Sequence, residues 1–146
     1  MWMAVSILWD LVLMENEIYK SVNQLVSGKQ FTIGNDLVFV PDFSNSLTDL
    51  FIKKVYTAQE VIYCDRFADS LLRYASTWAA KEAVYKALKQ VDDATLGWRK
   101  IEIIRKKTGG EPQVILHDHP KSYKISLTIS HDGDYVWAIA LIDTDN

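Results

Sequence analysis

The chain has 146 residues, enough for one domain with a sizeable core and too few for two full domains. Hydrophobic residues make up 49% of it and charged residues 24%, with only six glycines and three prolines, which excludes a disordered or collagen-like protein. The formal net charge is −3, so the chain lacks the basic excess that binding along a nucleic-acid backbone requires. We therefore expect a globular protein without a nucleic-acid partner.

The first 30 residues are expected to form a helical extension. Apolar residues recur at spacings of three and four between residues 4 and 26, and Ser27-Gly28 follows as a stop signal, which predicts an amphipathic helix. Residues 1–14 are very apolar, but they lack a basic start and a cleavage site, contain Asp10 and are shorter than the ~20 residues that cross a bilayer. We expect no membrane partner, and we expect this helix to pack on the domain or on a neighbouring subunit.

Cys64 is the only cysteine of the chain, so it has no partner for an internal disulfide. No Cys–His motif surrounds it, and we interpret it as a small buried hydrophobic residue. A lone unpaired cysteine favours a reducing compartment, and the cytoplasm is the expected location.

A strand is predicted over residues 31–40, because β-branched and aromatic residues dominate there. Gly34-Asn35-Asp36 interrupts the apolar run, so a kink or bulge is expected at that point. Residues 42–69 have an irregular pattern, with a short helix predicted over 48–55. The capping box Thr57-Ala58-Gln59-Glu60 predicts a further helical turn.

A long helix is predicted over residues 69–90, which contain no glycine or proline and are rich in alanine, leucine, lysine and glutamate. Small or apolar residues form one stripe along this helix, which lets a neighbouring element approach closely: Leu72, Ala75, Ala79, Ala83 and Ala87. Four strands are predicted after it, over residues 100–106, 112–116, 124–131 and 135–142. This order indicates an α+β fold, with the long helix packed on an antiparallel sheet and the main domain at residues 31–146.

Three places in the chain carry residues suited to chemistry. Asp36 lies between two apolar stretches, Lys81 and Glu82 precede Lys86 on the long helix, and a predicted strand ends in Ser130-His131. Each has an ordinary structural interpretation: a turn aspartate, a surface helical ion pair and a structural histidine. Each motif taken alone is weak, and their combination and order carry the argument.

Together these motifs resemble the 4′-phosphopantetheinyl transferase superfamily, specifically its small holo-(acyl-carrier-protein) synthase type. The matching segments are Ile33-Gly34-Asn35-Asp36, the helix Trp78–Ala87 with its Lys-Glu-Ala-x-x-Lys, and Ile129-Ser130-His131-Asp132. Phe51–Glu60 and Gly110-Glu111-Pro112 match further family segments. The resemblance spans residues 31–142 and leaves out the N-terminal helix.

The resemblance implies a transferase that moves 4′-phosphopantetheine from coenzyme A to a serine of an acyl-carrier or related carrier protein and releases adenosine 3′,5′-bisphosphate. It implies Mg²⁺ held by Asp36 and Glu82, whose hard oxygen ligands suit that ion. The resemblance assigns catalytic roles to Asp36, Glu82 and Lys86. Either Glu82 or a metal-bound water could accept the serine proton. The residues that the resemblance assigns to coenzyme A are Lys81, Lys86, Gly110, Pro112, Ser130 and His131. It also implies a homo-oligomer, most simply a trimer with sites between subunits.

Three departures from the family pattern stand out. Thr77 occupies a position that is often arginine in the family, and we expect Arg73 or Arg99 to supply the phosphate or adenine contact of that arginine instead. Lys89-Gln90-Val91 stands where many members have Gly-Thr-Gly. Residues 41–51 contain no arginine for an acidic carrier protein, which leaves three nearby cations for that partner: Lys53, Lys54 and Arg66.

An alternative function stays open. The chain could be a non-catalytic coenzyme A-binding or assembly module of a synthase complex that retains the fold. The carboxylate pair Asp36 and Glu82 favours the enzyme, because a pure binder has little need for two costly acidic groups.

Overall fold

The computed structural model describes residues 12–18, 20–21, 30–106 and 110–145. The chain divides into two units, Met1–Gln30 and Phe31–Asn146. In the first unit, residues 12–18 and 20–21 are helical, and Ile18 is among its exposed apolar side chains. The rest of the predicted N-terminal helix lies outside the described residues. Among the helices that the structure describes, none has the length and apolar character needed to cross a bilayer.

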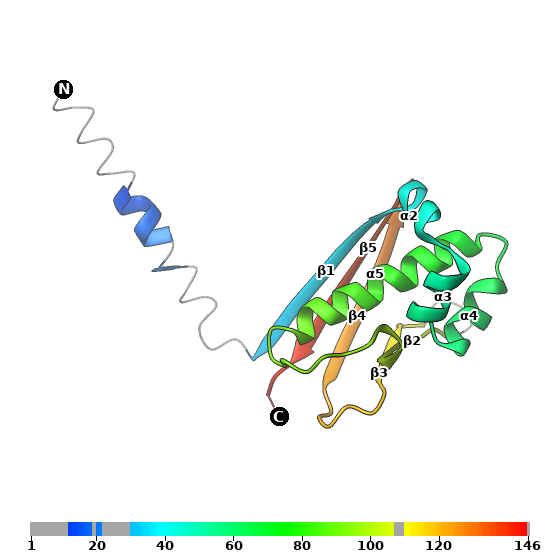
Figure 1. The fold of residues 1–146 in the computed structure, drawn as a ribbon. Coiled ribbons are helices and arrows are strands. Elements are labelled where there is room, and N and C mark those ends of the chain that lie inside the picture. Colours follow the sequence, from blue (N-terminus) through cyan, green and yellow to red (C-terminus); the bar gives the residue numbers. More distant parts are fainter. Residues whose placement is uncertain (1–11, 19, 22–29, 107–109, 146) are drawn as a thin grey trace. The chain divides into compact units, whose positions relative to one another are not determined.

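The second unit contains two antiparallel sheets (Figure 1). Strands β1 (Phe31–Phe39), β5 (Tyr135–Asp143) and β4 (Lys124–Asp132) form the larger sheet in that order. Strands β2 (Ile101–Ile104) and β3 (Gln113–Leu116) form the smaller one. All five strands fall within or close to the predicted segments, and the turn between β4 and β5 contains Gly133 at a positive φ of 53°. The predicted α+β class is confirmed.

Helix α5 (Ser70–Leu88) lies along the inner face of the larger sheet, with the shorter helices beside it (Figure 1). These are α2 (Val40–Ser46), α3 (Asp49–Val55), α4 (Ala58–Asp65) and the 3₁₀ turn η1 (Trp98–Lys100). The predicted capping box is confirmed, because Thr57 and Glu60 form it completely at the start of α4. The Thr48 side chain, which accepts from the Phe51 backbone nitrogen, caps α3 in addition. Helix α2 was not predicted. The available signal was Pro41, whose fixed φ suits the first turn of a helix.

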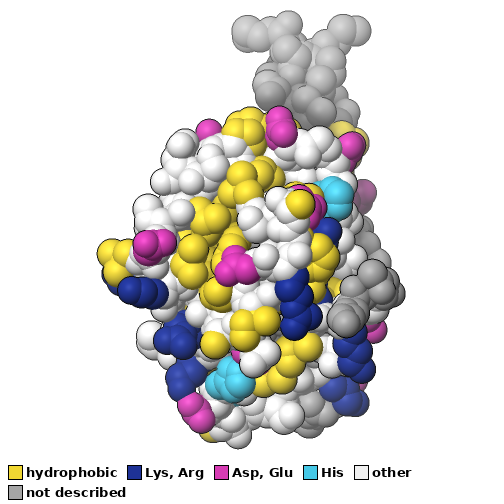
Figure 2. Space-filling view, turned by 90° about the vertical axis from the view of Figure 1, so that its right-hand side faces the viewer, with side chains coloured by type: hydrophobic (Ala, Val, Ile, Leu, Met, Phe, Trp, Pro, Cys, Tyr) yellow, Lys and Arg dark blue, Asp and Glu magenta, His cyan; other side chains and the backbone are white. Residues whose placement is uncertain are grey.

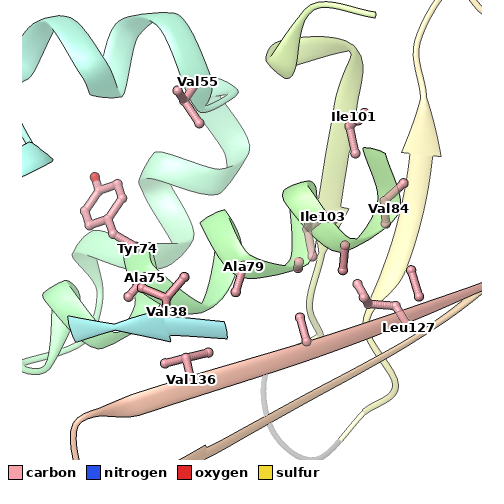
Figure 3. Close-up of a cluster of buried hydrophobic side chains, with 14 of the residues drawn as sticks. Val38, Val55, Tyr74, Ala75, Ala79, Val84, Ile101, Ile103, Leu127 and Val136 are labelled. Carbon is pink, nitrogen blue, oxygen red and sulfur yellow. The ribbon is translucent and has the colours of Figure 1, made fainter. Parts of the chain in front are cut away.

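The core forms where the alanine stripe of α5 meets the larger sheet. Ala75, Ala79, Ala83 and Ala87 are fully buried, as the stripe predicted. Figure 3 shows Ala75 and Ala79 facing Val38 of β1 and Val136 of β5. Because alanine side chains are short, the helix backbone comes close to the sheet.

Strand β1 pairs with β5 without interruption from Phe31 to Phe39, so the kink expected around Gly34 is absent. The glycine has a different cause. A Cβ atom at Gly34 would lie 2.0 Å from the Ala83 carbonyl oxygen and 2.6 Å from the Ala87 backbone nitrogen. Gly34 is therefore the point of close contact between β1 and α5, and it sets the distance between the two elements that carry the candidate site.

Candidate active site

Asp36, Glu82 and Lys86 meet where β1 passes α5, although they lie far apart in sequence. The Lys86 Nζ is 2.7 Å from Asp36 Oδ1 and 3.9 Å from Glu82 Oε2. It also donates to the backbone oxygen of Asn35 at 3.1 Å. The Asp36 side chain is 12% exposed and that of Glu82 27%, while Lys86 is 49% exposed. The fold thus gathers two carboxylates and one ammonium at a partly open position.

The two carboxylates influence each other directly. Burial raises the pKa of Glu82, and the neighbouring charge of Asp36 raises it further, whereas Lys86 acts in the opposite direction. With both acids ionised, a single ammonium leaves one negative charge uncompensated. Such a pair favours an additional cation.

The donor chemistry of this pair suits Mg²⁺. Within residues 12–18, 20–21, 30–106 and 110–145, no group of three or more His, Cys, Asp or Glu side chains is placed to enclose a metal ion. Two carboxylates without soft ligands leave the other coordination positions to water and phosphate oxygens, which is how Mg²⁺ is commonly held. The residues present therefore fit a magnesium ion whose remaining ligands would be water and phosphate oxygens.

A glutamine supports the site from the end of α5. Gln90 Nε2 donates to the backbone oxygens of Ile33, at 2.7 Å, and Lys86, at 3.1 Å. Together with the Lys86 contact to Asn35, it satisfies carbonyl groups along β1, which is an edge strand of the sheet. Sequence reasoning treated Gln90 only as a departure from the family loop. Its position four residues after Lys86 was the available signal for this role.

Lys81 does not join the cluster. Its side chain is fully buried, and its Nζ lies 2.8 Å from Glu60 Oε2 and donates to the backbone oxygens of Trp98 and Ile101. An ammonium group has three N–H donors, so none remains for a phosphate. This placement differs from the expected contact between Lys81 and coenzyme A.

Ser130 and His131 lie on β4, two strands away from Asp36. Ser130 pairs with Trp137 of β5, and His131 pairs with Val136. Asp36 is on β1, along the other edge of β5, where it pairs with Ala138. Directly opposed residues share a face, so His131 shares the inner face with Val136, and Ser130 shares the outer face with the exposed Trp137.

Gly110 and Pro112 lie between β2 and β3. Among the described residues, no hydrogen bond or ion pair joins either of them, Ser130 or His131 to the cluster of Asp36, Glu82 and Lys86. The structure therefore brings together three of the predicted site residues within one chain and leaves these four apart.

Thr77, the departure from the family's arginine, is buried on α5. Its hydroxyl donates to the Arg73 backbone oxygen at 2.9 Å and accepts a hydrogen bond from the Arg105 guanidinium. That guanidinium lies 4.4 Å from the centre of the Tyr63 ring. Arg105, in the segment after β2, is thus the arginine that contacts Thr77. Arg73 pairs with Asp69 at 3.4 Å, and the expected phosphate or adenine contact of Arg73 or Arg99 stays a prediction.

Comparison with known proteins agrees with this fold. A family model described as the 4′-phosphopantetheinyl transferase superfamily matches residues 32–140. A holo-[acyl-carrier-protein] synthase of Chlorobaculum parvum is 40% identical over 92 residues, which cover 63% of this chain and 78% of that protein. The synthase of Aquifex aeolicus is 33% identical over 118 residues, covering 75% and 96%.

A longer protein and a solved structure are also similar. The fatty acid synthase alpha subunit hexA of Dothistroma septosporum is 37% identical over 118 residues, and the matched part is only 7% of that subunit. The solved ACPS–CoA complex of Chronobacterium ammoniagenes has a TM-score of 0.70 at 25% identity and covers 81% of this chain and all of that one. Because the family match extends over most of the chain and covers nearly all of β1 and the whole of α5 and β4, the protein belongs to the 4′-phosphopantetheinyl transferase superfamily.

Proposed function

We propose that this chain transfers 4′-phosphopantetheine from coenzyme A to a serine of an apo acyl-carrier protein, with Mg²⁺, and releases adenosine 3′,5′-bisphosphate. The observation that carries the proposal is the cluster of Asp36, Glu82 and Lys86 in a chain of this superfamily. Residues 31–146 form the transferase domain, and residues 1–30 are an extension. A cytoplasmic location stays a prediction.

In the proposed reaction the serine Oγ forms a bond to the β-phosphorus of coenzyme A. The bond from that phosphorus to the bridging oxygen breaks, and the bridging oxygen leaves with adenosine 3′,5′-bisphosphate. When bound by Asp36 and Glu82, Mg²⁺ supplies charge neutralisation to the pyrophosphate. The Lys86 ammonium contacts Asp36 and is half exposed. It stabilises the negative charge that develops on the leaving phosphate.

Glu82 is the better acceptor for the serine proton. Its pKa is raised by burial and by Asp36, and a carboxylate with a raised pKa is a stronger base near neutral pH. Asp36 is less suited, because its Oδ1 already accepts a hydrogen bond from the Lys86 ammonium at 2.7 Å. Glu82 is thus the proposed proton acceptor, and Asp36 and Glu82 are the residues that would hold the metal.

Self-association of the chain is supported by the outer face of the larger sheet. Three cross-strand pairs of β1 and β5 place large apolar side chains there, each 36% exposed or more: Ile33 with Leu141, Leu37 with Trp137, and Phe39 with Tyr135. A contiguous exposed apolar surface of this kind is typical of a protein–protein interface. We propose a homo-oligomer, most simply a trimer. Ser130, on the same outer face, then contacts coenzyme A at the site of a neighbouring copy.

His131, Gly110 and Pro112 are proposed as further coenzyme A contacts in the same assembly. Docking of the carrier protein is assigned to the exposed Lys53 and Lys54 in the last turn of α3. Figure 2 shows Lys and Arg side chains in separate groups around the hydrophobic ones on one face of the molecule. Docking is therefore guided by local charge pairs and not by the overall electrostatic field of the protein, because the chain has a net charge of −3.

The test is mass spectrometry of candidate apo-carrier proteins after incubation with coenzyme A and Mg²⁺. We expect a gain of one phosphopantetheine group, no gain when the metal is chelated, and turnover reduced ~10²–10³-fold in Asp36→Asn and Glu82→Gln. Asp93→Asn, which changes an exposed carboxylate outside the site, serves as the matched control. Full activity of both site variants in metal-free buffer would contradict the assignment. Coenzyme A binding without transfer to any carrier would favour the non-catalytic module.

A further inference from the structure

A buried lysine lies directly beside the proposed catalytic glutamate. Lys81 precedes Glu82 on α5, yet its side chain is fully buried, whereas that of Glu82 is partly exposed. Successive helical residues are rotated by about 100°, so the two side chains leave α5 in different directions. Lys81 extends toward α4 and β2, and Glu82 lies on the side of β1.

The charge of Lys81 is matched entirely within the protein. Its Nζ lies 2.8 Å from Glu60 Oε2, and its other two donors reach the backbone oxygens of Trp98 and Ile101. Glu60 in turn accepts from the backbone nitrogens of Thr57, at 2.9 Å, and Ile103, at 2.8 Å. One ion pair therefore connects α4, α5, η1 and β2.

Helix α5 is thus held from two sides at two residues that flank Glu82, Lys81 and Ala83. Lys81 ties it to α4 and β2, and the Ala83 carbonyl contacts Gly34 of β1. Glu82 lies between these two points of attachment. If either attachment were lost, α5 could rotate or shift. The separation between Glu82 and Asp36 would then change.

We propose that Lys81 is a positioning residue of the transfer reaction, which acts through its buried pair with Glu60 to hold Glu82 opposite Asp36, and makes no contact with coenzyme A. The inference rests on the proposed roles of Asp36, Glu82 and Lys86. It also explains why a fully buried charge occurs next to the site.

The test compares Lys81→Met, Glu60→Gln and the double variant. In Lys81→Met the unpaired Glu60 carboxylate disturbs α5, so we expect kcat to fall about 10- to 100-fold. The dissociation constant for adenosine 3′,5′-bisphosphate, measured without metal, should stay within about twofold. In the double variant the uncompensated charge is gone, and kcat should recover by about tenfold over Lys81→Met, the non-additivity expected of a coupled pair.

The opposite pattern would overturn the proposal. If Lys81→Met weakens binding of adenosine 3′,5′-bisphosphate about tenfold and Glu60→Gln does not restore it, Lys81 is a ligand contact. If Lys81→Met does not fold, kcat and the dissociation constant for adenosine 3′,5′-bisphosphate are measured on the double variant. If the double variant does not fold either, both are measured on Lys81→Arg.

Two controls separate this inference from the function on which it rests. Lys89→Met, at an exposed lysine just after α5, should change neither quantity. Asp36→Asn is measured in parallel, because full activity of that variant would refute the site itself, whatever Lys81 does.

Discussion

Gly34→Ala is the substitution that tests most directly how the fold builds the site. The added Cβ would lie 2.0 Å from the Ala83 carbonyl oxygen, and the ordinary contact distance is about 3.5 Å, so β1 and α5 must separate by about 1.5 Å. Both atoms that a Cβ would meet closest belong to the helix backbone and cannot rotate away. The strain falls on the two elements that carry Asp36, Glu82 and Lys86.

Two consequences of this separation have different sizes. Overpacking of this kind costs about 1–3 kcal/mol of unfolding free energy. At about 2 kcal/mol, the melting temperature of a chain of this size should fall by roughly 5 °C. A displacement above 1 Å between catalytic groups should lower kcat by about 10²-fold. Catalysis should therefore suffer more than stability.

Calorimetry for Tm and mass-spectrometric transfer assays for kcat measure the two effects. Gly97→Ala is the matched control, because a Cβ there meets no atom within 4 Å and the backbone φ of −70° suits alanine. That variant should keep full activity and a Tm equal to or slightly above that of the parent chain. If Gly34→Ala behaves like Gly97→Ala in both assays, the close contact of β1 with α5 does not set the site geometry.

Three further predictions follow from the site and its surroundings. Lys86→Ala should lower kcat more than it raises KM for coenzyme A, because the ammonium acts on charge that develops in the transition state; the reverse would make it a binding residue only. Lys53→Glu combined with Lys54→Glu should raise KM for the carrier protein, as added salt would, and leave KM for coenzyme A unchanged. An unaltered carrier KM would place docking elsewhere. Light scattering should give about three times the 16.7 kDa of one chain, and Leu37→Lys with Trp137→Lys should lower that mass. A mass near 16.7 kDa for the parent chain at micromolar concentration would exclude the oligomer.

Local features of the chain were predictable because their causes lie within a few residues. The capping box at Thr57 and Glu60 uses only neighbouring side-chain and backbone groups. The alanine stripe of α5 and the alternating strands follow from periodicity alone. The order of the motifs along the chain was sufficient to identify the family and to single out Asp36, Glu82 and Lys86.

Other features depend on contacts between distant segments, which no local pattern contains. Gly34 has the sequence signature of a kink, but its actual cause is the approach of Ala83 and Ala87 from another element. Adjacent residues of the Lys-Glu motif are equally polar in sequence, yet Lys81 is buried against Glu60 while Glu82 lies at the partly open site. Which side of a helix is buried is decided by the elements that pack around it. The sequence by itself therefore determined the family and most of the elements, because their causes are local, and the tertiary packing decided which charged side chains are buried and which lie open to solvent.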